Sequence, residues 1–230
     1  MSQNTSAGHL LPQGRIESVL FTLSGSETVR RDSYVPITSF DLFRNGLPYP
    51  GGAYEAHTGT TDHAYRCQTC YNNKRGCLGH PGHVHMNYPV WNGIALEEAR
   101  KWLKLICFKC GKPIISETHY SRLPRAKRLD GAAKIARTSV KKCVHCHTLH
   151  PIVKKDPAEP LSLIATIMED KRQIDRWVIY PHMAGEILSR VDADTVVKLG
   201  KSVLSHPEHM VLWDIQVPPV TIRPDVKKMG

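Results

Sequence analysis

The sequence predicts an irregular α+β module with short strands, a few helices and two metal sites that replace part of a hydrophobic core. At 230 residues, with 41% apolar and only 7% aromatic side chains, the chain can bury one or two modest cores. Six of its seven cysteines form Cys-x-x-Cys pairs, namely Cys67/Cys70, Cys107/Cys110 and Cys143/Cys146. Such pairs direct two thiolates at one point, and two points complete the tetrahedral cage that zinc prefers.

The first third of the chain predicts extended structure. Residues 15–24 have an apolar middle and end at Gly25, as a strand would, and residues 34–38 form a second short extended piece. Residues 46–52 hold glycines and prolines and predict a turn region. Residues 1–66 are therefore expected to be a β-rich segment.

The first zinc site is expected within residues 67–90. Cys67, Cys70, Cys77 and His80 supply three thiolates and one imidazole within fourteen residues. His83 is the alternative fourth ligand, and Gly79 and Gly82 would allow the tight backbone that either histidine needs. Five other histidines are expected to be ordinary polar side chains or to orient the ligands: His63, His85, His145, His147 and His150.

A helix is expected from Asn92, which is placed to cap it, with two glutamates in its first turns. Its apolar face follows helical spacing through Ala95, Ala99, Trp102, Leu103 and Ile106. The helix would run into Cys107 and act as a rigid spacer between the two zinc sites.

The second site must join Cys107 and Cys110 to Cys143 and Cys146 across an insert of thirty-two residues, as in a zinc ribbon with a long loop. A structural zinc contributes on the order of 10 kcal/mol in small peptides. Pro124 and Gly131 predict a short helix and an exposed loop in the insert, within a segment 91–150. Neither cage leaves a position open for water, so a hydrolytic metal centre is disfavoured.

The last segment, residues 151–230, is expected to be mainly helical. Residues 161–168 are apolar but too short to assign from their period. Pro181 suits the first turn of a helix that buries Ile187 and Leu188, and Asp192 is placed to cap a second helix that stops at Gly200. Residues 217–224 contain three prolines and are expected to be extended.

The positive charge is concentrated in one segment. Residues 100–142 carry thirteen basic and two acidic side chains, whereas the rest of the chain is nearly balanced. Such a segment suits a phosphate backbone, although a merely solvated surface would have the same composition. The candidate nucleic-acid contacts are Arg122, Arg125, Lys127, Arg128, Lys134 and Arg137.

No run reaches the eighteen or so apolar residues of a membrane span, so no membrane partner is expected, and the N-terminus lacks the pattern of a secretory signal. We therefore expect an intracellular protein with reduced cysteines. In that setting Cys-x-x-Cys pairs indicate metal rather than disulfides.

Several stretches, in order, resemble the N-terminal part of the largest subunit of multi-subunit DNA-directed RNA polymerases. They include Gly51-Gly-Ala-Tyr-Glu, Cys67-Gln-Thr-Cys, Cys77-Leu-Gly-His-Pro-Gly-His, Ile106-Cys-Phe-Lys-Cys-Gly and Val217-Pro-Pro-Val-Thr-Ile-Arg-Pro. The wording of residues 59–63 and 195–201 looks most like versions from large cytoplasmic DNA viruses of the asfarvirus kind. Ala53 stands where the family usually has leucine.

The resemblance implies the clamp core that closes over template DNA, braced by zinc at the two ligand sets given above. Its implied partners are DNA and the DNA–RNA hybrid, the second-largest subunit and the remainder of the largest subunit. The family's magnesium-binding loop of three aspartates is missing, so this chain should bind no magnesium and be inactive alone. A viral chain would work in the host cytoplasm and virion, a cellular one in the nucleus.

A free-standing zinc-ribbon transcription factor that binds nucleic acid is the alternative. It would predict a self-contained surface, whereas a clamp piece should expose apolar side chains that another subunit covers. A ubiquitin-ligase type cross-brace is disfavoured, because twenty-six residues separate His80 from Cys107.

Overall fold

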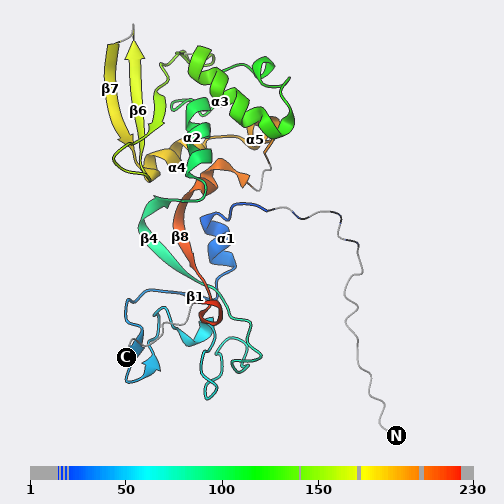
Figure 1. The fold of residues 1–230 in the computed structure, drawn as a ribbon, viewed down its shortest axis with the longest axis vertical. Helices are drawn as coiled ribbons and strands as arrows, with labels where there is room; N and C mark the ends of the chain where they lie inside the picture. The colour runs from blue at the N-terminus through cyan, green and yellow to red at the C-terminus, as the bar shows by residue number, and fades with distance from the viewer. Residues whose placement is uncertain are drawn as a thin grey trace.

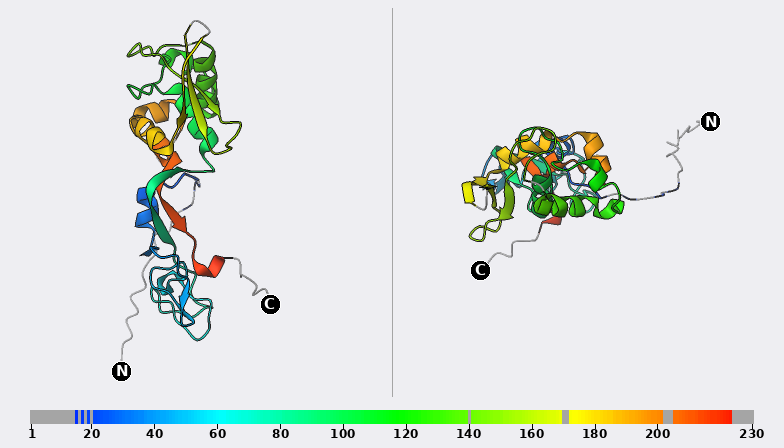
Figure 2. Two further views of the ribbon diagram at one scale, coloured as in Figure 1. Left: turned by 90° about the vertical axis from the view of Figure 1, so that its left-hand side faces the viewer. Right: turned by 90° about the horizontal axis from the view of Figure 1, so that it is seen from above.

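The computed structural model describes residues 21–139, 141–169, 172–201 and 205–223, together with residues 15, 17 and 19. These residues form two lobes joined by a long antiparallel ribbon, so that the molecule is elongated (Figures 1 and 2). The upper lobe of Figure 1 holds most of the helices, and the lower lobe is built largely from loops.

The upper lobe is organised around α2 (Leu96–Leu105). Ala99, Trp102 and Leu103 on its predicted apolar face are completely buried, which confirms the helical spacing. Asn92 does not cap the helix, because the N-cap position falls on Ala95 and no side chain among the described residues accepts from the N–H groups of the first turn. The cysteine pair at 107–110 follows directly after the C-cap at Ile106.

The basic insert folds onto α2 rather than forming an exposed loop. It contains the 3-10 turns Glu117–His119 (η2) and Arg125–Lys127 (η3) and the helix α3 (Arg128–Ser139). The helix runs through Gly131, which was expected to interrupt it. Leu123 packs so closely on this position that a Cβ would lie 2.4 Å from one of its methyl groups, which accounts for the glycine. The insert adds to the core the buried side chains of Ile114, Ile115, Tyr120, Leu129, Ala132 and Ala136.

Residues 151–223 contain more strands than the sequence indicated. β5 (Ile152–Lys155), β6 (Leu163–Glu169) and β7 (Arg172–Ile179) form an antiparallel sheet in the order β5-β6-β7, which settles the ambiguous run at 161–168 as a strand. The two predicted helices are present as α4 (Pro181–Ser189), with Pro181 in its first turn, and α5 (Ala193–Lys198). The Asp192 carboxylate caps α5 by accepting from the Thr195 N–H at 2.7 Å.

The ribbon between the lobes consists of β4 (Gly82–Trp91) and β8 (Val211–Val217), which pair antiparallel, with β1 (Val35–Pro36) parallel to β4. The 3-10 turn η5 (Pro207–Met210) leads into β8, and α1 (Ser26–Arg31) packs on β8. At about 3.3 Å per residue, β4 spans about 30 Å. The ribbon, and not α2, is therefore the spacer between the two cysteine clusters.

A buried carboxylate fastens α1 to this ribbon. Asp214 on β8 is completely buried and accepts from Arg30 Nε at 2.8 Å, while His85 Nδ1 on β4 lies 2.9 Å from its other oxygen. Burial alone would raise the pKa of Asp214, but the hydrogen bonds from His85 and Arg30 outweigh it and hold the pKa below its ordinary value.

The lower lobe has almost no apolar core among its described residues. It contains the two-residue strands β2 (Phe43–Arg44) and β3 (Leu47–Pro48) and the 3-10 turns η1 (Ala56–Thr58) and η6 (Val220–Ile222). Between residues 38 and 81 the only buried apolar side chains are those of Cys67 and Cys77. In the upper lobe, by contrast, the core cluster comprises 27 of the described residues.

Three expectations for the two terminal segments were wrong where the structure describes them. Residues 15, 17, 19 and 21–24 form no strand, and residues 26–31, just beyond them, form the helix α1 instead. With three two-residue strands, the described part of segment 1–66 is not β-rich. Residues 217–223 are not extended throughout, since η6 forms a turn there that packs on the lower lobe, and residue 224 lies outside the described residues.

Candidate metal centres and nucleic-acid interface

The lower lobe assembles the first predicted ligand set. The ligand atoms of Cys67, Cys70, Cys77 and His80 all lie within 4.8 Å of one another. His80 Nε2 is buried and has no hydrogen-bond partner among the described residues, which is costly unless the atom binds a ligand. Three thiols and an imidazole nitrogen match the donor set of a closed, tetrahedral zinc site.

The upper lobe assembles the second set from the two remaining pairs. Cys107 Sγ lies 3.5 Å from Cys146 Sγ, and Cys110 Sγ lies 3.7 Å from Cys143 Sγ. A tetrahedron with metal–sulfur bonds of about 2.3 Å has sulfur–sulfur edges of about 3.8 Å, so the spacing fits a single ion. All four sulfur atoms lie within 4.8 Å of one another.

The three Cys-x-x-Cys turns share one backbone geometry. In each, the first cysteine donates its N–H to the carbonyl five residues later and accepts from the N–H four residues later. The residue after the second cysteine has a positive φ, which is 58° at Tyr71, 71° at Gly111 and 56° at His147. The repeated turn aims both sulfur atoms of a pair at one point, because it curls the backbone around them.

The thiols differ in acidity before any metal binds. Burial raises the pKa of Cys107 to about 12 and that of Cys77 to about 11. The neighbouring His80 imidazole lowers the pKa of Cys70 to about 6, and a hydrogen bond with Thr148 lowers that of Cys146 to about 6. Each cluster therefore combines an acidic thiol at its rim with a buried thiol that must lose its proton to bind a metal.

The other histidines lie outside both clusters. His83, the alternative ligand, points its Nδ1 at Ser33 Oγ, 2.8 Å away, while His85 contacts Asp214. His150 Nε2 lies 3.1 Å from the Lys104 carbonyl oxygen, and burial lowers the pKa of His150 to about 4. The geometry thus separates His80 from His83, which spacing alone left open.

The residues after β8 close the lower lobe around its cluster, which no sequence pattern indicated. Thr221 Oγ1 donates to the Leu78 carbonyl at 3.1 Å, and Arg223 Nη1 donates to the Ala53 carbonyl at 2.6 Å. At Gly79, inside the cluster loop, φ is +88° and a Cβ would lie 2.2 Å from Thr221 Oγ1. The C-terminal segment and the cluster loop therefore pack so closely that only glycine fits between them.

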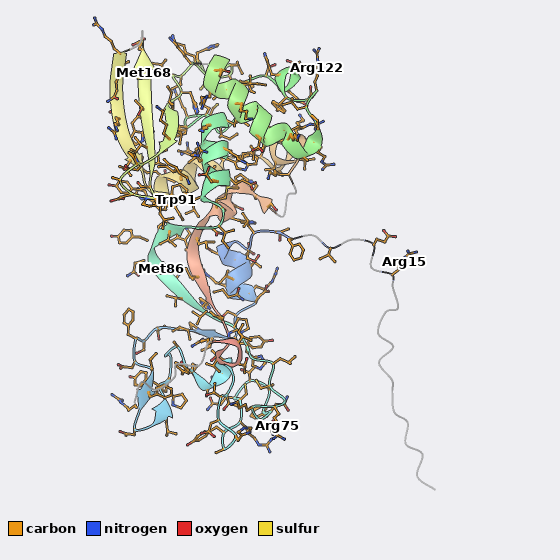
Figure 3. All side chains as sticks on the ribbon, in the orientation of Figure 1. Arg15, Arg75, Met86, Trp91, Arg122 and Met168 are labelled. Carbon is orange, nitrogen blue, oxygen red and sulfur yellow. The ribbon has the colours of Figure 1, made fainter. Side chains whose placement is uncertain are left out.

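The basic candidates fall into two kinds. Arg122, Arg125, Lys127, Lys134 and Arg137 are exposed, and Arg122 lies at the helical side of the upper lobe, opposite Met168 of the sheet (Figure 3). Arg128 is instead half-buried, and its guanidinium donates to three backbone carbonyls, those of Ser121, Leu123 and Lys198. Arg128 therefore joins the start of α3 to the end of α5.

Large apolar side chains are exposed on both lobes and on the ribbon. Phe40 is fully exposed, and Leu78 and Ile94 are each more than 90% exposed. A further group in the lower lobe is about half exposed or more: Phe43, Leu47, Tyr65 and Tyr71. This is the surface expected of a piece that packs against other protein, rather than of a self-contained factor.

The fold and its sites define an α+β module of two lobes, each organised by one four-ligand cluster that could hold a metal ion. Residues 13–230 match the family described as RNA polymerase Rpb1, domain 1, and the chain belongs to this family. It corresponds to the N-terminal part of the largest RNA polymerase subunit, and the free-standing zinc-ribbon factor is not favoured.

Three relatives illustrate the range of similarity, each aligned over 92% of this chain. The DNA-directed RNA polymerase RPB1 homolog of African swine fever virus is 42% identical over 212 residues. Subunit Rpo1N of Methanothermobacter thermautotrophicus is 28% identical, and RNA polymerase II subunit RPB1 of Euplotoides octocarinatus is 25% identical. The chain spans 14%, 24% and 48% of these relatives, respectively. The expected likeness to viral versions is confirmed.

No helix among the described residues is long and apolar enough to span a membrane.

Proposed function

We propose that this chain is the clamp portion of a DNA-directed RNA polymerase and closes over template DNA while two zinc ions hold its lobes in shape. The observation that carries the proposal is the family match over residues 13–230, with both predicted ligand sets assembled in the same fold. The nucleotidyltransferase activity belongs to the complete polymerase, whose magnesium is held elsewhere, and this chain alone is inactive.

The zinc ions are structural in this proposal. Cys67, Cys70, Cys77 and His80 hold one ion, and Cys107, Cys110, Cys143 and Cys146 hold the other. Four protein ligands saturate each ion, so neither offers a position for water or substrate. What the ions supply is folding free energy, above all in the lower lobe, where buried apolar side chains are few.

The nucleic-acid surface in this proposal is the basic side of the upper lobe. Arg122, Arg125, Lys127, Lys134 and Arg137 would contact the phosphate backbone of DNA or of the DNA–RNA hybrid without reading sequence. Arg128 acts by positioning this surface, because all three of its hydrogen bonds hold neighbouring backbone.

The exposed apolar side chains would be covered by the remainder of the largest subunit and by the second-largest subunit. For a chain with these viral relatives, the proposed place of action is the host cytoplasm and the virion.

Light scattering of the zinc-loaded chain with and without a second-largest polymerase subunit tests the proposal. We expect the chain to associate weakly with itself when alone and to form a defined complex when the subunit is added. A monodisperse chain that ignores the subunit but binds DNA tightly would instead favour an independent factor.

A further inference from the structure

The helices α2 and α3 enclose a groove of about 570 Å³ on the upper lobe. Its lining comes from one face of each helix: Arg100, Lys101, Lys104, Asp130, Ala133, Lys134, Arg137 and Thr138. Five of these side chains are cationic and one is anionic. Lys134 and Arg137 are among the six candidate nucleic-acid contacts named above. Arg100, Lys101 and Lys104 belong to the same basic segment, residues 100–142, but lie on α2.

Two of the five cations are already neutralised. Lys101 Nζ lies 2.5 Å from Asp130 Oδ1 across the groove, and Arg100 pairs with Glu97 of its own helix at 2.6 Å. The other three, Lys104, Lys134 and Arg137, form no ion pair with any residue that the structure describes. The groove therefore carries an uncompensated positive charge contributed by both helices.

These cations are close enough to influence one another. Partial burial lowers the pKa of Lys104, and the charges of Arg100 and Arg137 lower it further. Asp130 offsets only one of the five positive charges, so an anion bound in the groove would relieve the remaining repulsion between these two packed helices.

We propose that the α2/α3 groove binds the phosphate backbone of a nucleic-acid duplex, with Lys104, Lys134 and Arg137 as its phosphate ligands. This inference rests on the proposed function and gives it a particular site. None of the residues that line the groove is aromatic, so it offers no platform on which the bases of a single strand could stack. Contacts to phosphate alone also predict that affinity is independent of base sequence.

The groove is distinct from the exposed residues before α3. Arg122, Arg125 and Lys127 precede the helix, whereas Lys134 and Arg137 lie one turn apart in its second half. A matched control lies on the sheet of the same lobe, where three exposed cations form no ion pair with any described residue: Lys154 of β5 and Arg172 and Arg176 of β7.

The test compares binding of the zinc-loaded chain to a 20-base-pair duplex and to a single strand of equal length, between 50 and 200 mM salt. The groove variant combines Lys104→Gln, Lys134→Gln and Arg137→Gln, and the control combines Lys154→Gln, Arg172→Gln and Arg176→Gln, which should leave duplex binding unchanged. Three phosphate contacts account for about a forty-fold loss of affinity over this salt range. The affinity of the groove variant for the duplex should therefore fall about forty-fold less than that of wild type between 50 and 200 mM salt, and its affinity at 50 mM salt should be correspondingly lower.

A charge-preserving variant, Lys104→Arg, Lys134→Arg and Arg137→Lys, should bind like wild type, which separates lost charge from lost packing. Should the full groove variant fail to fold, Lys134→Gln with Arg137→Gln changes only exposed side chains and should remove about a twelve-fold salt effect. If the control variant loses duplex binding and the groove variant does not, the groove inference is wrong and the proposed function stands. If the wild-type chain binds no nucleic acid, both fail.

Discussion

Removing the lower metal site should unfold the lower lobe and leave the upper lobe folded. The perturbation is the double variant Cys67→Ala and Cys70→Ala, which deletes half of the lower ligand set. The matched control, Cys107→Ala and Cys110→Ala, deletes the equivalent turn of the upper set.

The expected difference follows from how each lobe is packed. Fully burying a large aliphatic side chain stabilises a fold by about 1.5–3 kcal/mol, whereas a structural zinc supplies about 10–16 kcal/mol. The lower lobe buries two cysteines and, between residues 38 and 81, no other apolar side chain. Without its ion it cannot offset the conformational entropy of folding. The upper lobe keeps Trp102, Leu103 and the rest of a 27-residue cluster among the described residues.

Hydrogen–deuterium exchange read by mass spectrometry reports the two lobes separately. In the lower-site variant the amides of Gln68, Tyr71 and His80, which donate to backbone carbonyls in the folded lobe, should exchange at unprotected rates. The amides of Ala99 and Ile106 at either end of α2 should stay protected. Lower-lobe amides that remain protected without the ion would refute the reasoning, as would upper-lobe unfolding of equal extent in both variants.

Three further outcomes are expected. Asp214→Asn should lower the free energy of unfolding at neutral pH by about 1.5–3 kcal/mol. Because the folded-state pKa of Asp214 lies below its ordinary value, this difference from wild type, measured by urea titration, should vanish as the pH falls through that pKa. A difference that stays constant with pH would contradict the ion pairs. Gly79→Ala should lower the free energy of unfolding by at least about 1 kcal/mol and speed the loss of zinc to a chelator, whereas Gly93→Ala, where a Cβ meets open space, should do neither. Equal rates of zinc loss in the two variants would exclude the close packing at Gly79. Arg128→Gln should lower the melting temperature yet leave the salt dependence of DNA binding unchanged, and a flatter dependence would make Arg128 a phosphate contact.

The sequence was most informative for features that depend on residues close together in the chain, such as ligand spacing and helical periodicity. Cys-x-x-Cys spacing predicted which residues gather in the two four-residue clusters, because each pair forms its turn within a few residues. The helical spacing of Ala99 and Trp102 predicted the buried face of α2, and the position of Asp192 just before α5 predicted that it caps that helix. Each of these features depends on neighbours in the chain, and a single sequence displays those directly.

The sequence did not predict features that depend on contacts between residues far apart in the chain. β4 contains Pro89 and several polar side chains, and its strand conformation depends on pairing with β8, more than a hundred residues later. Gly131 lies inside a helix and serves there to make room for Leu123, which packs where a side chain would go. Arg223 closes the lower lobe by donating to the Ala53 carbonyl, which lies 170 residues earlier in the chain.

The basic segment shows the same limit in the candidate interface. Composition located its charge but could not tell Arg128, which bonds backbone, from Lys134, which is exposed. It also could not show that α2 and α3 bring their cations to one groove.

Native mass spectrometry of the purified chain, combined with X-ray absorption at the zinc edge, decides whether both clusters are closed zinc sites. We expect two zinc ions per chain that share seven sulfur donors and one nitrogen donor, with no coordinated water. A single ion, or two ions with oxygen in their coordination shells, would contradict it.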